Sequence, residues 1–324
     1  MKNEKQYTIG IDIGGTNTVF GIVDRDGKVV AKGSIKTGKH KNFDDYLSEL
    51  HAQLSKLIDE KGLKGQIVGI GIGAPGANYH TGEIYNAANL KHWGERVELA
   101  KLVSEKFGLP TAVTNDANAA TMGEMAYGAA KGMKDFVMIT LGTGIGSGIV
   151  SNGKLIYGHD GLAGELGHII VERRGGRKCG CGRSGCLETY GSSTGVVRTA
   201  REFLKKEQPS LLRQIPEDQI TSKDVYDAAM AGDSLAKEIF DFTGQMLGEA
   251  FADFTAYSSP EAIILFGGLT RSGDLLMEPL KKAFDESLLF IYTDKPKILL
   301  SQLNEDDGAV LGASALGWEA AEEK

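Results

Sequence analysis

Apolar residues along this chain fall into two patterns, and each pattern predicts one kind of element. Short apolar runs that end at glycines or turn residues predict β-strands at residues 7–13, 19–23, 28–30, 67–73, 111–114, 136–141, 147–150, 262–266 and 297–300. Helical spacing of apolar residues is clearest at residues 43–61, and further helices are predicted at residues 98–107, 118–127, 235–257 and 310–321. Because strands alternate with helices, we expect an α/β protein with mixed sheets.

Two of these segments have an unusual composition. Residues 67–73 carry glycine at every second position, which predicts the close approach of another backbone or of a ligand. Residues 235–257 carry Phe and Met side chains that are more typical of a packed core than of a cofactor site.

The first strand–turn–strand unit recurs near the middle of the chain. Residues 11–28 contain IDIGGT, then GIV, then the turn DGK, and residues 139–154 contain ITLGT, then GIV, then the turn NGK. This internal repeat predicts two related domains that face each other. Two unrelated glycine-rich hairpins would be the alternative explanation.

Composition and charge exclude several classes of function. Of the 324 residues, 41% are apolar and 24% are charged, which is enough apolar material for a substantial core in two domains. The net charge is −7 and no basic stretch would follow a phosphate backbone, so we expect no nucleic-acid partner. We also expect no membrane partner, because no apolar run is long enough to span a bilayer and residues 1–5 do not resemble a signal peptide.

All three cysteines lie within eight residues, and a histidine precedes them by eleven. Three thiolates and one imidazole complete a tetrahedral zinc shell, which leaves no position for water and therefore predicts a structural zinc. The ligands would be His168, Cys179, Cys181 and Cys186, of which His168 has the weakest support. Cysteines that bind metal indicate a reducing compartment, and hence the cytoplasm.

Two glycine turns between strands are candidate phosphate-binding sites, at residues 14–16 and 142–146. Backbone N–H groups in such turns can point at phosphate oxygens, because glycine has no side chain to block the approach. The pattern is not a Walker loop, since strands rather than a helix follow the turns. Asp12, just ahead of the first turn, would hold Mg²⁺ through water, or else accept hydrogen bonds from local amides.

Asn115 and Asp116 stand between the predicted strand 111–114 and the predicted helix 118–127. A carboxylate at a strand end is well placed to accept the proton of a substrate hydroxyl. The same residue types commonly cap helices, and spacing alone favours that use here. Glu165 and Glu188 flank the predicted zinc ligands, so a bound metal would also fix these two carboxylates.

Several motifs in order make the chain resemble the sugar kinases of the repressor, open-reading-frame and kinase (ROK) family, over essentially its whole length. They are DIGGT at 12–16, GAPG at 73–76, NDAN at 115–118, LGTGIGSG at 141–148, ELGH at 165–168, CGCGRSGCLE at 179–188 and FGG at 266–268. The resemblance implies the two-domain actin/hexokinase-like ATPase fold of the ribonuclease H-like group, with duplicated mixed β-sheets and flanking helices. We expect a smaller N-terminal domain of residues 1–117 with 308–324, and a larger domain of residues 118–307 with the zinc segment.

The resemblance also implies residue roles. Asp116 would be the catalytic base at the sugar 6-hydroxyl. The sugar would be bound by Gly76, Asn89, Asn115, Asp116, Glu165, His168 and Glu188. ATP and Mg²⁺ would be held by Asp12, Gly14, Gly15, Thr16, Gly142, Thr143, Gly144, Gly267 and Gly268. His168 would bind zinc through one ring nitrogen and sugar through the other.

The implied activity is ATP-dependent phosphorylation of the 6-hydroxyl of glucose. The cysteine segment looks like that of the family's glucokinases, while N-acetylmannosamine and N-acetylglucosamine kinases share nearly all the motifs. A sugar-sensing transcriptional regulator is the alternative from another class. It is disfavoured because only six residues precede the first predicted strand, where family repressors carry a DNA-binding helix-turn-helix. A zinc hydrolase is disfavoured because four protein ligands would fill the metal. The resemblance further suggests a homodimer or homotetramer.

Overall fold

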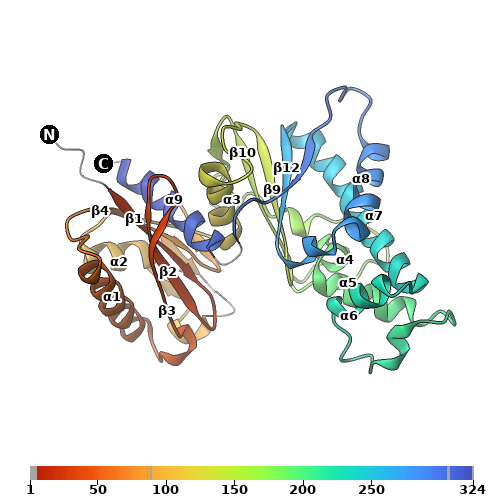
Figure 1. The fold of residues 1–324 in the computed structure, drawn as a ribbon, viewed down its shortest axis with the longest axis horizontal. Helices are drawn as coiled ribbons and strands as arrows, with labels where there is room; N and C mark the ends of the chain where they lie inside the picture. Colours follow the sequence, from red (N-terminus) through yellow and green to blue (C-terminus); the bar gives the residue numbers. More distant parts are fainter. Residues whose placement is uncertain (1–5, 86, 88–89, 305–306, 323–324) are drawn as a thin grey trace. The chain divides into compact units, whose positions relative to one another are not determined.

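The computed structural model describes residues 6–85, 87, 90–304 and 307–322 (Figure 1). The chain separates into two compact units. The first comprises Met1–Met133, Leu155–Ala163 and Ser301–Lys324, and the second comprises Lys134–Lys154 and Gly164–Leu300. The domains suggested by the sequence divide the chain elsewhere, at residues 117/118 and 307/308. They differ from the compact units mainly in the helix that starts at Asp116 and in the segment Leu155–Ala163.

The first unit is built on a five-stranded mixed sheet. Its order is β3 (Val29–Ile35), β2 (Thr18–Asp24), β1 (Tyr7–Ile13), β4 (Ile67–Gly73) and β8 (Thr111–Thr114). The strands β1, β4 and β8 are parallel, and β2 runs antiparallel to both β1 and β3. The carboxyl ends of the three parallel strands therefore share one edge. A small sheet of β5 (Ala77–Asn78), β6 (Glu83–Tyr85) and β7 (Arg96–Val97) belongs to the same unit.

Helices cover both faces of this sheet. Successive side chains of a strand point to opposite faces, so each face carries residues that pack against helices. Ile9 and Ile11 are fully buried in a core shared with α1 (Phe43–Glu60) and α2 (Leu99–Phe107). On the opposite face, the Thr8 hydroxyl donates to the Ser314 carbonyl of α9 (Gly308–Glu322) at 3.1 Å.

The alternating glycines of β4 lie on the face that α9 covers. A Cβ atom at Gly71 would lie 1.9 Å from the carbonyl oxygen of Ala313, and one at Gly69 would lie 2.2 Å from that of Gly317. The expected close approach is thus confirmed, and its partner is the backbone of α9.

The second unit repeats the topology of the first. Its sheet has the order β11 (Lys154–Leu155), β10 (Ile145–Ser151), β9 (Phe136–Leu141), β12 (Ala262–Phe266) and β13 (Lys297–Leu300). β10 is antiparallel to β9, while β9, β12 and β13 are parallel, as β1, β4 and β8 are. The predicted duplication of mixed sheets is therefore confirmed at the level of strand order and direction.

Helices pack against the sheet of the second unit. They are α4 (Glu188–Gly191), α5 (Ser193–Phe203), α6 (Ser222–Met230), α7 (Ser234–Ser258) and α8 (Asp274–Ser287). Phe240, Phe251 and Phe254 of α7 are buried, which confirms that the aromatic residues of this helix form core. Only α7 among these helices was predicted individually. In the first unit, α3 (Asp116–Tyr127) begins two residues before its predicted start.

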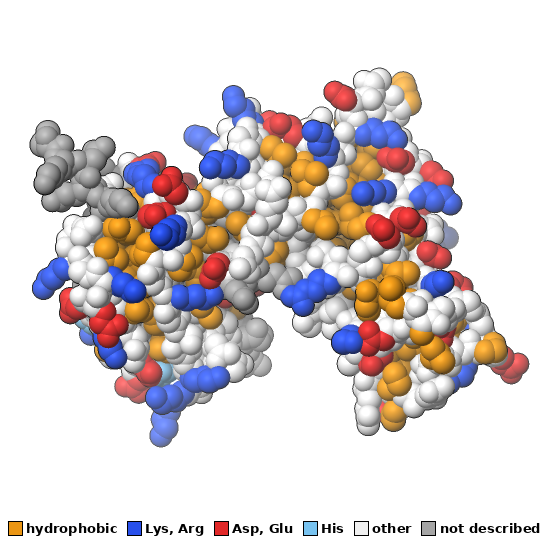
Figure 2. All heavy atoms as spheres, viewed as in Figure 1, with side chains coloured by type: hydrophobic (Ala, Val, Ile, Leu, Met, Phe, Trp, Pro, Cys, Tyr) orange, Lys and Arg blue, Asp and Glu red, His pale blue; other side chains and the backbone are white. Residues whose placement is uncertain are grey.

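The surface carries charges of both signs. On the face shown in Figure 2, acidic and basic side chains are interspersed over each unit, in keeping with 43 acidic and 36 basic residues. Among the described residues, no helix combines the length and the apolar character that a membrane span requires.

Candidate active site

Three predicted segments of the first unit meet at the carboxyl edge of its sheet. Gly14 follows β1 directly, Gly76 lies shortly after β4, and Asn115 follows β8. Because these strands are parallel neighbours, the segments lie along one edge, which is where open α/β sheets bind their ligands. Gly76 has a φ of +68°, a left-handed conformation that favours glycine.

Asp12 and Asp116 form the acidic part of this edge. Asp12 pairs in register with Gly73. A Cβ atom at Gly73 would lie 3.0 Å from the Cβ of Ala119, and 4.0 Å from both the Asp12 Oδ1 and the Asp116 Cα, so the two aspartates lie on either side of this glycine. Burial and, to a lesser extent, the charge of Asp116 raise the pKa of Asp12 to about 6. Carboxylate oxygens at such a spot suit Mg²⁺, which would favour the charged form of Asp12.

The sequence left open whether Asn115 and Asp116 cap the following helix or serve the substrate, and the structure gives the two residues different contacts. The Asn115 side chain caps α3 by accepting a hydrogen bond from the Asn118 N–H at 2.7 Å. Asp116 is the first residue of the helix, and its Oδ1 accepts from the adjacent Ala117 N–H at 2.9 Å. The Asp116 side chain is exposed. Capping therefore falls to the asparagine, and the aspartate remains accessible to a substrate.

In each of the two glycine turns, one backbone N–H already donates a hydrogen bond within the turn. Gly14 N–H donates to the Asn17 carbonyl at 2.9 Å, and Gly142 N–H donates to the Gly144 carbonyl at 3.0 Å. Thr16 and Thr143 are exposed at the tips of the two turns.

Glu188 explains why residue 144 is glycine. A Cβ atom at Gly144 would lie 2.3 Å from Oε2 of Glu188, and the same oxygen accepts from the Ile145 N–H at 3.0 Å. The other oxygen, Oε1, lies 3.8 Å from Sγ of Cys179. Glu188 therefore links the second glycine turn to the cysteine cluster, a contact that the motif spacing did not reveal.

The segment with Glu165 and His168 packs on β10. The short helix η3 (Leu166–His168) is held by the Ser147 hydroxyl, which accepts from the Leu166 N–H at 3.0 Å. Gly167 is required here, because a Cβ atom would lie 2.3 Å from the Ile145 carbonyl oxygen. Glu165 itself is exposed at the start of this turn.

The predicted zinc ligands come together. One donor atom from each of His168, Cys179, Cys181 and Cys186 lies within 4.8 Å of the others. Sγ of Cys179 is 3.7 Å from Nδ1 of His168, and Sγ of Cys181 is 3.6 Å from Sγ of Cys186. A tetrahedral zinc site with Zn–S bonds of about 2.3 Å has edges of about 3.5–3.8 Å. The donor set thus fits a four-coordinate zinc.

The environment of the thiols is uneven. Burial raises the pKa of Cys186 to about 12, and it also raises that of Cys179. A hydrogen bond from the backbone of Arg183 lowers the pKa of Cys181, which is exposed.

A pocket of about 580 Å³ lies at the carboxyl edge of the second sheet. It is lined by three residues that were predicted to bind nucleotide, Gly142, Thr143 and Gly268. It is also lined by residues that the sequence did not indicate, namely Ser193, Ser222, Lys223, Tyr226, Leu269, Arg271 and Ser272. The missed residues belong to α5, α6 and the short helix η5 (Gly268–Ser272) or lie beside them. Apart from the FGG motif at the start of η5, these segments carry no recognisable motif, and only the strand ends that they flank point to them. Gly267, next to the pocket, has a φ of +107°.

The predicted sugar-binding residues are distributed over both units. Gly76, Asn115 and Asp116 belong to the first, and Glu165, His168 and Glu188 belong to the second. Asn89, the remaining predicted sugar ligand, lies outside the described residues.

Comparison with known proteins decides the family. The sequence model of the ROK family matches residues 8–320. The chain belongs to the ROK family. This confirms the resemblance carried by the motifs, and with it the actin/hexokinase-like fold that the duplicated sheets display.

Named relatives include both kinases and repressors. The glucokinase of Halalkalibacterium halodurans is 38% identical over 97% of this chain and 94% of its own length. The N-acetylglucosamine repressor of Escherichia coli O157:H7 is 27% identical over 96% of this chain but only 75% of its own length. Among solved structures, a ROK family glucokinase from Streptomyces griseus, in complex with glucose and AMPPNP, has a TM-score of 0.76 and 32% identity. It matches 97% of this chain and 99% of its own.

Proposed function

We propose that this protein is an ATP-dependent hexose kinase that phosphorylates the 6-hydroxyl of glucose and releases ADP. The observation that carries the proposal is the exposed carboxylate of Asp116, beside Asp12 at the carboxyl edge of the first sheet. A named glucokinase at 38% identity and a ROK glucokinase structure with glucose and a nucleotide support the same reaction.

Asp116 is proposed as the general base. Its carboxylate would accept the proton of the sugar 6-hydroxyl while that oxygen attacks the terminal phosphorus of ATP. Bound Mg²⁺ would neutralise the developing charge on the phosphates, and Asp12 is the residue proposed to hold it. Asn115, whose side chain is fixed by the α3 cap, would then orient the sugar beside this base.

The second unit is proposed to bind the nucleotide. Its pocket is lined by Gly142, Gly268 and two cationic side chains, Arg271 and Lys223, of which Lys223 is paired with Asp227 at 2.5 Å. Positive charge and bare glycine backbone suit an anionic triphosphate. Thr143, exposed at the tip of its turn, would contact the phosphates.

Zinc is proposed as a structural ion. Four protein ligands close its shell, so that it offers no open position for substrate or water. The ion would join η3 to the loop of residues 177–186, here called the cysteine loop. It would thereby fix Glu165, His168 and Glu188, the proposed sugar contacts of the second unit. Thiolate ligands require a reducing environment, which supports a cytoplasmic location. We also propose that the protein forms a homodimer or homotetramer, on the family resemblance alone.

A substrate panel tests the proposal. ADP release is coupled to a spectroscopic readout, with glucose, mannose, fructose, N-acetylmannosamine and N-acetylglucosamine compared at equal concentrations. We expect the highest kcat/KM with glucose. A higher value with N-acetylmannosamine or N-acetylglucosamine would replace glucose by that substrate, and the absence of ADP release with every sugar would reject the kinase.

A further inference from the structure

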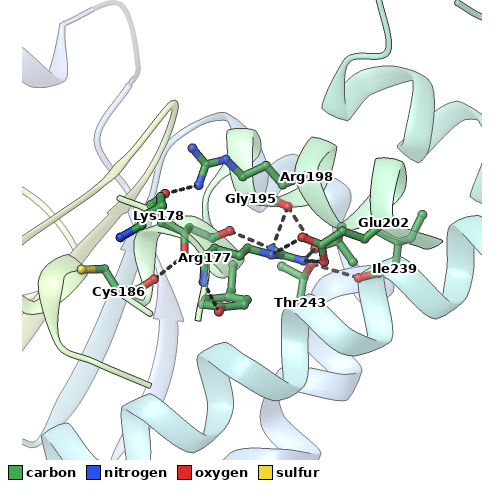
Figure 3. A network of polar contacts seen from close by, with 11 residues as sticks. Arg177, Lys178, Cys186, Gly195, Arg198, Glu202, Ile239 and Thr243 are labelled. Atoms are coloured by element: carbon green, nitrogen blue, oxygen red, sulfur yellow. Dashed lines mark hydrogen bonds and ion pairs between the residues drawn. The ribbon is translucent and has the colours of Figure 1, made fainter. Parts of the chain in front are cut away.

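Arg177 stands two residues before the first cysteine, and its side chain is only 9% exposed. Its guanidinium carries five N–H donors, which make five contacts. Figure 3 shows this network, with Glu202 and Gly195 beside the guanidinium. Nε and Nη2 form a fork on Glu202 at 2.9 and 2.6 Å. Nη2 also donates to the Thr199 hydroxyl at 2.9 Å. Nη1 donates to the carbonyls of Thr189 at 2.7 Å and Gly195 at 3.4 Å.

Aromatic rings and backbone contacts complete the site. The guanidinium carbon lies 4.4 Å from the ring centre of Tyr190 and 5.8 Å from that of Phe242, so the cation is also stabilised by ring faces. The Arg177 N–H donates to the Tyr190 hydroxyl at 2.9 Å, and the Arg177 carbonyl accepts from Gly185 N–H at 2.8 Å. Gly185 immediately precedes the last cysteine, so Arg177 joins the two ends of the cysteine loop.

These contacts reach the residues of the proposed active site. Thr189, whose carbonyl Arg177 holds, directly follows Glu188, and Glu188 contacts both Ile145 and Cys179. A second arginine strengthens the attachment, because Nη1 of Arg198 donates to the Lys178 carbonyl at 2.7 Å. The cysteine loop is thus fastened to α4 and α5 by contacts that involve none of the four proposed zinc ligand atoms.

We propose that Arg177 is a positioning residue, which docks the cysteine loop on α4 and α5 and so sets the geometry of both the zinc ligands and Glu188. The proposal rests on the proposed function in its catalytic consequence, but not in its effect on the metal. Arginine is needed because a lysine ammonium cannot present a planar fork to Glu202 and also reach Thr189. Removing a group that hydrogen-bonds a metal ligand directly commonly weakens metal binding by about 10–100-fold. Arg177 acts one step further out, through the backbone of the cysteine loop and Thr189.

The test compares zinc affinity, by competition with a chromogenic chelator, in the wild type, Arg177→Lys, Arg177→Met and Glu202→Gln. We expect zinc binding to weaken by up to about 10-fold in both Arg177 variants, the lower end of the range for groups that touch the ligands themselves, and a smaller loss in Glu202→Gln, which keeps an oxygen acceptor. The KM for glucose should rise with little change in kcat, because binding rather than the transition state is affected. Hydrogen exchange of residues 177–190 in zinc-stripped protein should be faster in the variants than in the wild type.

Lys206→Met is the matched control. Lys206 also pairs with a glutamate, Glu238 at 2.6 Å, and lies 3.7 Å from the ring centre of Phe203, but its partners belong to α7 and the end of α5. It should leave zinc affinity and KM unchanged. If Arg177→Met does not fold, Arg177→Lys and Glu202→Gln decide. Wild-type zinc affinity and KM in those two variants would overturn the proposal. A wild type that binds zinc but does not phosphorylate glucose would reject the proposed function alone.

Discussion

Replacing Asp12 by Asn should stabilise the first unit at neutral pH when no metal is bound. Burial is the larger cause that raises the pKa of Asp12 from its ordinary 3.8 to about 6, and the charge of Asp116 adds to it. The folded protein therefore holds a proton on Asp12 more tightly than the unfolded chain does. The stability that this proton confers is fully present below about pH 4 and is lost as the pH rises through about 6.

The size of the effect follows from the two pKa values. A rise from 3.8 to about 6 corresponds to about 3 kcal/mol of unfolding free energy once the pH exceeds both values. The side chain is partly accessible to solvent, which makes this an upper figure. We expect the stability gap between Asp12→Asn and the wild type to grow by about 2–3 kcal/mol between pH 4 and pH 7.5. Titrating groups other than Asp116, which is coupled to Asp12, behave alike in both proteins and cancel in this gap.

The protein supplies its own probe for this measurement. The sequence has two tryptophans, Trp93 and Trp318, and both are buried in the first unit, which also contains Asp12. Urea unfolding followed by tryptophan emission, with EDTA present, therefore reports on the unit in question. Asp116→Asn removes only the smaller cause of the pKa rise and should stabilise less. A gap that does not change with pH, or equal gains from the two variants, would refute the reasoning.

Three further predictions concern catalysis, metal and packing. Asp116→Asn should lower glucose turnover by about 10²–10⁴-fold with zinc content unchanged by atomic absorption; near-normal turnover would remove its assigned role. Cys181→Ala should release zinc and raise the KM for glucose, so an unchanged KM in the metal-free variant would break the link between zinc and sugar. Gly71→Ala should cost about 3 kcal/mol or more by overpacking, because its Cβ would lie 1.9 Å from the Ala313 carbonyl oxygen. Gly38→Ala, where the nearest atom is 3.5 Å away, is the control, and equal tryptophan-monitored stabilities of the two variants would contradict the packing argument.

The fold was predictable wherever the sequence carries a periodic or repeated signal. The duplicated motif at residues 11–28 and 139–154 indicated two related sheets, and the strand orders agree. The alternating glycines of β4 predicted a close contact. They did not identify α9 as the partner, because that helix lies more than 200 residues later in the chain. Contacts over such separations depend on the packed tertiary structure, which a local pattern does not encode.

The candidate site was predictable where glycine, aspartate or cysteine must occupy a special place. The cysteine cluster and the strand-end aspartates have that property. Lys223 and Tyr226 in the nucleotide pocket do not, since their surface helix α6 carries them in an ordinary amphipathic pattern. Arg177 was also missed, because an arginine beside two cysteines looks like any exposed cation until its five acceptors are assembled around it.

The two sheets share a topology, but the first carries an aspartate where the second carries an uncharged threonine. This difference supports the separate roles proposed for the two units. Asp12 in β1 corresponds in the repeat to Thr140 in β9. The Thr140 hydroxyl accepts from the Gly146 N–H at 3.0 Å and so serves its own turn, whereas Asp12 faces Asp116 across Gly73. A second carboxylate at residue 140 would repel phosphate near the pocket of the second unit. The uncharged copy therefore suits the nucleotide, and the acidic copy suits Mg²⁺ and the hydroxyl that must lose a proton.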